Sequence, residues 1–307
     1  MGIVFGPINS RRFGKSLGID LSPMGKQCNF DCLYCELEPS KVISRYSDII
    51  AVDTILEELT RVLKEHRDIS VVTVTANGEP TLYPHLGELI DGINRVKGRS
   101  RSLILSNSST ISDRNIQDIL ARFDTVKLSL DCATARCLKR LDRAENSIDI
   151  EDIKRGIVEF SEKFKNELIL EILFVKGIND SDIEISKLNS FLETLDGVTR
   201  VDIGSIDRPP AYGVEGIDYQ SLREISLKFG SKVPINITSR VYSRNMDSSN
   251  YSREDILDTI RKRPLTQEDI DILFNETSKA IFQDMVGSYI DRVSRGSYTF
   301  FTIKGGK

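Results

Sequence analysis

The polar and apolar positions of the first 240 residues follow two alternating patterns. Short runs rich in β-branched and other apolar residues, such as 70–75 and 168–175, are typical of buried strands. Between such runs, apolar residues recur every three or four positions, as at Ile55, Leu59 and Val62, which predicts amphipathic helices. The predicted strands are 17–22, 70–75, 102–106, 125–130, 168–175 and 199–205, and the predicted helices are 53–66, 85–97, 112–122, 181–195 and 219–229, with a broken helical region over 133–164.

This order predicts an α/β fold made of six β–α units in series. Strands joined through helices run parallel, and their crossovers are right-handed. Six units are too few for a closed eight-fold barrel. We therefore expect an open, partial (β/α)6 barrel over 17–242, in which 233–242 is a further edge strand.

The two ends of the chain break this repeat. Residues 1–16 are expected to form an arm whose charges, Arg11, Arg12 and Lys15, are either solvated or form a cationic lip over an anionic substrate. Residues 243–252 are polar and are predicted to be a linker.

The segment 253–307 is predicted to be a separate small domain. It begins with a helix over 253–263 capped by Ser252, followed by a helix that starts with Thr266 and Asp269 in a capping-box pattern. A longer helix over 276–294 and a strand over 297–304 complete the order, which is typical of a winged-helix module.

Composition narrows the function classes. The formal net charge of −4 gives no general signal for nucleic acid or acidic membranes, and residues 251–307 carry nine basic and nine acidic side chains. The predicted winged helix is therefore expected to dock a protein or peptide, or to pack against the barrel. No apolar run suggests a secretory signal or a membrane span, and an odd number of cysteines indicates a reducing compartment, so we expect a cytoplasmic protein.

Three of the five cysteines lie in the stretch Cys28-Asn-Phe-Asp-Cys32-Leu-Tyr-Cys35, directly after the first predicted strand. Three thiolates this close can converge on one metal centre, and thiolates are the usual ligands of iron–sulfur clusters. The alternative, a structural zinc, needs a fourth ligand, but His66 and His85 are distant in the sequence. The spacing favours a cubane cluster with one iron left open.

With its C-x3-C-x2-C loop after the first strand of a six-unit β–α chain, this sequence resembles the radical S-adenosylmethionine (SAM) superfamily. The resemblance implies that Cys28, Cys32 and Cys35 hold a [4Fe-4S] cluster whose open iron chelates SAM. It further implies reductive cleavage of SAM to a 5′-deoxyadenosyl radical, which abstracts hydrogen from a substrate. A one-electron donor such as flavodoxin or ferredoxin is the expected partner.

The resemblance also assigns SAM contacts to the strand ends. Asn77-Gly-Glu-Pro80 resembles the family's Gly-Gly-Glu-Pro motif, in which Glu79 faces the SAM ammonium, and asparagine tolerates left-handed geometry in place of the first glycine. Gly177 is expected to let the backbone approach adenine closely. The complete set of implied contacts is Tyr34, Asn77, Gly78, Glu79, Pro80, Ser106, Asn107, Ser129, Asp131, Val175, Gly177 and Ile178.

A narrower resemblance is to a bacterial and archaeal group related to the wyosine-base-forming tRNA enzymes, which often carry a C-terminal winged helix. It rests on 6–18, the cysteine loop, 78–82, 129–131, 177–179 and Arg208-Pro-Pro210. Those enzymes carry a second cluster, for which Cys132 and Cys137 provide too few ligands. Buried thiols are the favoured interpretation of these two cysteines.

Three functions remain open at this point. One is modification of an RNA base, with Arg11, Arg12, Lys15 and Arg208 as phosphate contacts. Another is modification of a protein or peptide docked by the winged helix. The third is a non-enzymatic cluster protein for electron transfer or redox sensing, which the SAM-type motifs at 77–80 and 106–109 disfavour.

Overall fold

The computed structural model describes residues 2–10, 13–238, 250–262, 264–295 and 298–305. Its main element is one eight-stranded sheet in which the strands follow each other in chain order, β1 to β8. Strands β2 to β8 are parallel, and β1 is antiparallel to β2. The strands are β1 (Val4–Ser10), β2 (Gly14–Asp20), β3 (Val71–Thr75), β4 (Arg101–Ser106), β5 (Thr125–Ser129), β6 (Glu167–Phe174), β7 (Arg200–Ser205) and β8 (Ile235–Ile237).

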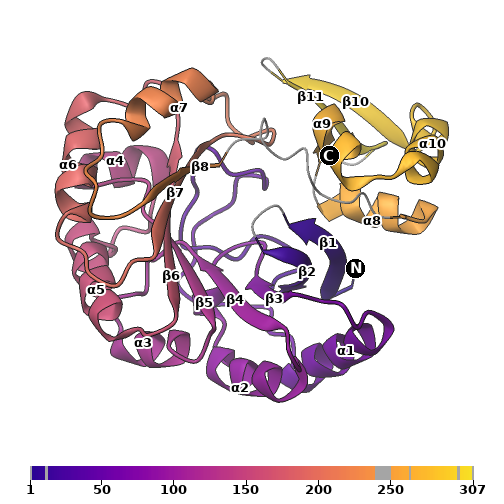
Figure 1. The fold of residues 1–307 in the computed structure, drawn as a ribbon, viewed down its shortest axis with the longest axis horizontal. Coiled ribbons are helices and arrows are strands. Elements are labelled where there is room, and N and C mark those ends of the chain that lie inside the picture. The colour runs from indigo at the N-terminus through magenta and orange to yellow at the C-terminus, as the bar shows by residue number, and fades with distance from the viewer. Residues whose placement is uncertain (1, 11–12, 239–249, 263, 296–297, 306–307) are drawn as a thin grey trace.

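Helices cover the convex side of this curved sheet (Figure 1). They are α1 (Val52–Glu65), α2 (Leu86–Val96), α3 (Arg114–Leu120), α5 (Ile150–Lys163), α6 (Asp182–Leu192) and α7 (Tyr219–Ser226). Leu59, Ile90 and Ile157 on these helices are completely buried in the core that joins helices to sheet. The predicted α/β fold with a mostly parallel sheet is confirmed, and β1 and β8 are the two edges of the sheet.

The concave face of the sheet carries a group of charged side chains. On β5, Val126 and Leu128 belong to the hydrophobic core, so Lys127 between them points to the opposite face. The Lys127 ammonium lies 2.6 Å from Glu171 Oε1 and 3.1 Å from Asp202 Oδ2. A charged network of this kind suits the lining of an open barrel better than its packed exterior.

The first correction concerns the N-terminus. Residues 4–10 of the predicted arm form strand β1, because Val4 packs into the core, the Phe5 ring lies against Gly18, and the two residues pair with Ile19 and Gly18 of β2. Arg11 and Arg12 lie outside the described residues. Helix α1 begins after Ala51 and has no side-chain cap.

The C-terminal segment has its own hydrophobic core, which includes Phe274, Phe282 and Ile290. Its antiparallel three-stranded sheet has the order β10-β11-β9. Ile8 of β1 packs against this core, and the hydroxyl of Tyr251 donates a hydrogen bond to the Pro7 carbonyl oxygen at 3.4 Å. The elements are α8 (Arg253–Lys262), β9 (Leu265–Thr266), α9 (Gln267–Leu273), α10 (Glu276–Met285), β10 (Ile290–Arg295) and β11 (Tyr298–Ile303).

The helix predicted over 276–294 is too long. Helix α10 ends at Met285, and Gly287 has a φ of +87°, a left-handed conformation that stops a helix. Residues 290–295 instead pair with β11 as a strand. Of the predicted linker 243–252, residues 243–249 lie outside the described part of the chain. In the described residues, no helix combines the length and apolarity that crossing a membrane requires.

Candidate functional site

The cysteine loop begins at the carboxyl end of β2, where parallel sheets place their sites. Cys28, Cys32 and Cys35 are free of disulfide bonds, and Cys28 is 9% exposed. Burial, and after it the nearby Glu79 carboxylate, raise the pKa of the Cys28 thiol to about 12. The pKa of Cys32 is also raised, first by burial and then by Asp142 and the two neighbouring cysteines. Three thiols that act on one another fit a cationic metal centre that would keep them deprotonated.

Backbone hydrogen bonds hold this loop against three other segments. Gln27 N donates to Asn77 O at 2.8 Å, and Glu79 N donates back to Gln27 O at 3.0 Å. Asp31 N and Leu33 N donate to the carbonyls at 142 and 141, at 3.0 and 2.9 Å. Ile43 N donates to Cys28 O at 2.9 Å. The positions of the cysteines are therefore fixed from several sides.

Gly78 is the residue that the close contact to Gln27 requires. Its φ is +150°, and a Cβ at this position would lie 1.8 Å from Gln27 O. Asn77 does not have a positive φ, so its expected left-handed geometry is wrong. Instead the Asn77 side-chain amide donates to Asp20 Oδ2 at 2.8 Å, which ties the end of β3 to the end of β2.

The Glu79 carboxylate is 1% exposed and accepts four hydrogen bonds from its own chain. The donors are Thr81 N and Thr81 Oγ1, Ser106 Oγ and Asn107 N, at 2.6 to 3.0 Å. Burial nevertheless raises the pKa of Glu79, because desolvation outweighs these hydrogen bonds. Through these hydrogen bonds Glu79 joins the 77–80 motif to the end of β4. The motif ends at Pro80, the first residue of the short helix η1 (Pro80–Leu82). The predicted contact with a SAM ammonium stays a prediction.

Asn107 lies directly beside a predicted cluster ligand. Its side-chain nitrogen is 3.7 Å from Cys28 Sγ and donates to Asn29 Oδ1 at 2.9 Å. Ser106 is buried, and its hydroxyl donates to Glu79. The structure therefore brings the predicted pair at 106–107 to the cysteine loop.

Tyr34 and Asp131 also meet. The Tyr34 hydroxyl donates to Asp131 Oδ2, and Leu173 N donates to Asp131 Oδ1 at 2.6 Å. Burial outweighs the hydrogen bonds from Leu173 and Tyr34, and the pKa of Asp131 is raised to about 7. Ser129, two residues earlier, is half-buried at the end of β5, where it and Asp131 line a small cavity with Tyr34.

Val175, Gly177 and Ile178 follow the end of β6. Val175 N donates to Asn179 Oδ1 at 2.8 Å, and Ile178 N donates to Val175 O at 3.1 Å, which closes a turn. Gly177 has a φ of +70°, but no heavy atom lies within 4 Å of the position a Cβ would take. Within the chain, its backbone conformation rather than a close contact requires glycine here.

The sequence interpretation missed Asp31, which lies in the spacer between Cys28 and Cys32. Asp31 Oδ1 is 2.9 Å from the Lys26 ammonium, and both side chains are nearly buried. Asp31 Oδ2 accepts a hydrogen bond from the Tyr212 hydroxyl and lies 3.6 Å from Arg143 Nη1. The position of this carboxylate between two cysteines of the motif was the signal that the sequence offered. The residues that contact it come from distant loops.

The predicted cluster of phosphate-binding cations does not form as expected. Lys15 lies at the start of β2, at the end of the sheet opposite the cysteine loop, and pairs with Asp68 at 2.7 Å. Arg208 forms an ion pair with Glu36, next to Cys35. Arg11 and Arg12 lie outside the described residues.

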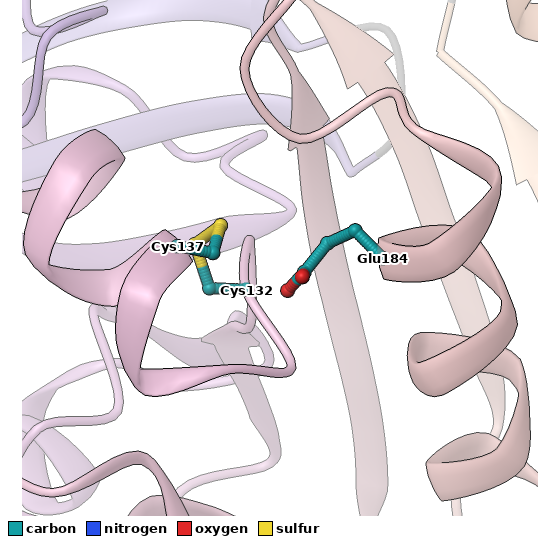
Figure 2. A group of neighbouring side chains, drawn as sticks. All are labelled: Cys132, Cys137 and Glu184. Atoms are coloured by element: carbon teal, nitrogen blue, oxygen red, sulfur yellow. A yellow bond between two sulfur atoms is a disulfide. The ribbon is translucent and has the colours of Figure 1, made fainter.

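Cys132 and Cys137 are joined by a disulfide and are not buried thiols as predicted. Both are buried, and the short helix α4 (Ala135–Cys137) brings them together (Figure 2). The Glu184 carboxylate beside them accepts hydrogen bonds from Ala133 N and from the backbone and hydroxyl of Thr134. The two sulfurs are bonded to each other, and the Glu184 carboxylate already accepts three hydrogen bonds. This group therefore provides no ligands for a second cluster.

The residues at the strand ends therefore provide three thiols and an adjacent polar rim. Three thiols are one fewer than the four that fully ligate a [4Fe-4S] cluster, so this donor set fits a cluster with one open iron. Asn107 lies beside one of these thiols, and Glu79 and Tyr34 belong to hydrogen-bonded networks at the same ends of the strands.

Comparison with known proteins agrees with this geometry. Residues 22–187 match the model of the radical SAM superfamily. A UPF0026 protein of Helicobacter pylori is 38% identical over 277 residues, which cover 90% of this chain and 89% of that protein. A protein of Exiguobacterium sibiricum named "Probable dual-specificity RNA methyltransferase RlmN" is 21% identical over 185 residues, covering 57% of this chain and 51% of that one.

Among solved structures, a radical SAM methyltransferase from Sphaerobacter thermophilus superposes with a TM-score of 0.56. The identity is 14%, and the alignment covers 73% of this chain and 66% of that one, so the likeness concerns the fold. The family uses a [4Fe-4S] cluster and SAM as its cofactors. The chain belongs to the radical SAM superfamily, as an enzyme of the radical SAM type.

Proposed function

We propose that Cys28, Cys32 and Cys35 hold a [4Fe-4S] cluster with one open iron and that SAM binds to this iron at the carboxyl ends of β3 to β6. The main support for the proposal is that the cysteine loop contacts both the 77–80 motif and Asn107. Gln27 and Gly78 are in backbone contact, and the Asn107 amide lies 3.7 Å from Cys28 Sγ. The chemistry that these cofactors supply is reductive cleavage of SAM to a 5′-deoxyadenosyl radical for hydrogen abstraction.

The chain's own residues would position SAM and keep water away. The half-buried Tyr34 and Asn107 line a small cavity together with Ser129 and Asp131. Backbone groups around Gly78 and the turn at Gly177 are the proposed contacts to the amino acid part and the adenine of SAM. An electron donor of the flavodoxin or ferredoxin class would reduce the cluster, and we propose that the enzyme works in the cytoplasm.

We propose an RNA base as the substrate, within the group related to the wyosine-forming enzymes. The similarity to a protein named as an RNA methyltransferase supports this choice. The enzyme assignment disfavours the alternative of a purely electron-transferring or sensing protein.

A second candidate is a protein or peptide substrate, supported by the C-terminal segment. Its order of helix, strand, two helices and two strands is that of a winged helix, which we propose it to be. Arg253 lies over the exposed Tyr289 ring at 4.7 Å, a surface pair suited to protein contacts.

The test is anaerobic reconstitution with iron and sulfide, followed by SAM and dithionite and quantification of 5′-deoxyadenosine. We expect about four irons per chain, and Cys32→Ala should lose both iron and product because a cubane needs its thiolates. The control Cys132→Ala/Cys137→Ala removes two cysteines outside the loop and should retain iron. A wild-type protein that holds its cluster but forms no 5′-deoxyadenosine would contradict the proposal.

The substrate choice is tested separately. Mass spectrometry of RNA nucleosides from a deletion strain should show one modified base missing. An unchanged nucleoside profile together with a changed peptide would favour the protein substrate.

A further inference from the structure

The segment after β5 has two faces of opposite character. Over 136–143, two exposed residues alternate with two buried ones along α4 and the helical turn η2 (Leu138–Asp142). The buried residues are Cys137, Leu138, Leu141 and Asp142, and the exposed residues are Arg136, Lys139, Arg140 and Arg143. All four cations are exposed while the residues between them are buried, which puts the cations on the solvent side of this segment. We call these four residues the basic face.

The basic face is not neutralised by its surroundings. Among the described residues, Arg136, Lys139 and Arg140 form no ion pair, whereas Arg143 lies 3.6 Å from Asp31. Glu145, the next acid along the chain, accepts hydrogen bonds from Ser147 and forms no ion pair with these cations among the described residues. This local positive charge contrasts with the net charge of −4 of the whole chain.

The opposite side of the same segment holds the cysteine loop. The carbonyls of Leu141 and Asp142 accept hydrogen bonds from Leu33 N and Asp31 N. The basic face reaches the cysteine loop at its Arg143 end, where Arg143 Nη1 lies 3.6 Å from Asp31 Oδ2.

Arg143 adds an aromatic partner to the basic face. Its guanidinium lies 4.7 Å from the centre of the half-buried Tyr212 ring, and its side chain is 43% exposed. A planar guanidinium supported by a tyrosine is a surface on which an unstacked base can stack. The combination of phosphate-binding cations with a stacking surface favours RNA over an acidic peptide.

The positive surface continues at the start of α4. A hollow of about 470 Å³ is lined there by Lys154, Lys187 and Thr134, among others. Lys154 pairs with Glu151 at 2.6 Å, whereas Lys187 forms no ion pair among the described residues. Four cations within eight residues can contact two or three neighbouring phosphates of one strand.

We propose that the basic face is the docking surface for the phosphate backbone of an RNA substrate, with the Arg143–Tyr212 pair next to the site of chemistry. This inference rests on the proposed RNA substrate. It assigns RNA binding to the barrel rather than to the C-terminal segment.

The test measures binding of fluorescein-labelled bulk transfer RNA to the reconstituted holoenzyme at several salt concentrations. The variant Arg136→Gln/Lys139→Gln/Arg140→Gln should bind about tenfold or more weakly at 0.1 M salt. The slope of log affinity against log salt should fall by about 2, since each lost phosphate contact removes roughly 0.7. Iron content of the variant shows that the cysteine loop still forms.

The matched control is Lys64→Gln/Arg95→Gln/Arg99→Gln, which removes three exposed cations at the other end of the strands. It should bind RNA within twofold of the wild type. Equal losses in both triple variants, or tighter binding of polyglutamate than of RNA, would overturn the docking surface. If the wild type cleaves SAM but binds no RNA, this inference fails while the radical SAM function stands. If it does not cleave SAM, the proposed function fails.

Discussion

The two ends of the parallel strands are built differently. At the amino ends, short turns lead from each helix into the next strand, such as 97–100 and 121–124. At the carboxyl ends, long segments leave the strands, above all 21–51 and 206–218. The amino ends connect the elements of the fold, whereas the carboxyl ends carry the cysteine loop.

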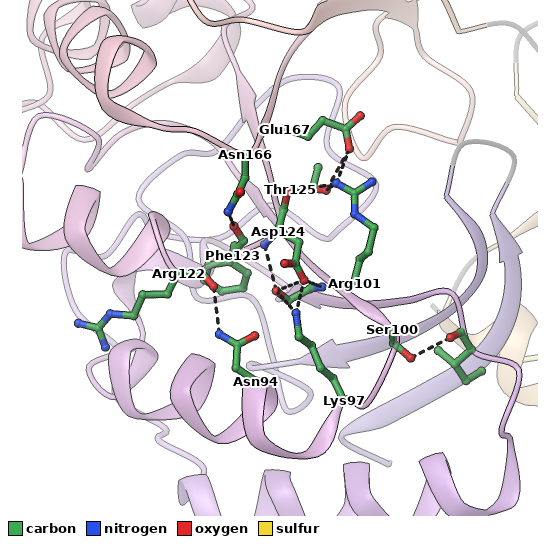
Figure 3. A network of polar contacts seen from close by, with 12 residues as sticks. Asn94, Lys97, Ser100, Arg101, Arg122, Phe123, Asp124, Thr125, Asn166 and Glu167 are labelled. Atoms are coloured by element: carbon green, nitrogen blue, oxygen red, sulfur yellow. Dashed lines mark hydrogen bonds and ion pairs between the residues drawn. The ribbon is translucent and has the colours of Figure 1, made fainter.

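The polar contacts show the same division. At the amino ends, Asp124 accepts hydrogen bonds from Lys97 and from Ser102 N, and Arg101 pairs with Glu167 at 2.8 Å (Figure 3). These residues belong to adjacent turns and strands, and several are partly exposed, so each contact adds little to stability.

At the carboxyl ends, Asp31 and Glu79 are buried and join segments far apart in the chain. Burying these two carboxylates costs free energy of folding. It occurs at the end of the sheet where the cysteines must be positioned. The same kind of residue therefore forms local, partly exposed contacts at one end of the strands and buried contacts between distant segments at the site.

The largest effect is expected from Gly78→Ala. A Cβ would lie 1.8 Å from Gln27 O at a φ of +150°, so the cysteine loop must move away from the 77–80 motif. We expect a loss of about 3 kcal/mol in the free energy of unfolding and a loss of most bound iron. Urea denaturation and iron analysis measure the two effects.

Gly98→Ala is the matched control at the amino ends. Gly98 has a φ of +60°, but no atom lies within 4 Å of its Cβ position. The substitution should cost about 1 kcal/mol and leave iron binding intact. If both variants lost iron equally, the division between the two ends would be wrong.

The sequence predicted the parallel sheet well because its signals are local. Runs such as 168–175 and helices with apolar stripes depend only on neighbouring residues, and β6 and α5 lie within or next to the predicted ranges. Strand β1 was missed because residues 4–10 contain Gly6 and Pro7, which weaken the strand signal, and because it pairs through a hairpin.

The candidate site was predictable only where a motif marks it. The cysteines and the 77–80 motif are recognisable in the sequence, and the structure brings them together. The network around Asp31 was not predictable, because Tyr212 is separated from Asp31 by 181 positions in the chain. The prediction that Lys15 lies near the substrate was wrong, because the charge of a residue does not show at which end of a strand it lies.

An intermediate effect is expected from Asp31→Asn, which removes the charge facing Lys26. The Lys26 and Asp31 side chains are only 6% and 9% exposed, so the ammonium would stay buried without its carboxylate. We expect a loss of about 2 kcal/mol and a lower iron content after reconstitution.

The control is Asp68→Asn, which breaks the exposed pair with Lys15 at the amino ends. It should change stability by less than about 0.5 kcal/mol. Iron content unaffected by Asp31→Asn would show that this carboxylate does not organise the cysteine loop.

The smallest effect concerns the pH dependence contributed by Asp124 at the amino ends. Burial alone would raise the pKa of Asp124, but hydrogen bonds from Lys97 and Ser102 hold it below its ordinary value. Because the folded protein then binds the proton less readily, Asp124 stabilises the fold above pH ~4 and loses this effect as the pH falls further. Asp124→Asn should therefore cost about 1 kcal/mol at pH 6 and less at pH 3.5 in urea denaturation. Added salt should narrow the difference at pH 6, since the carboxylate is 37% exposed, and a difference that grew on acidification would refute the assignment.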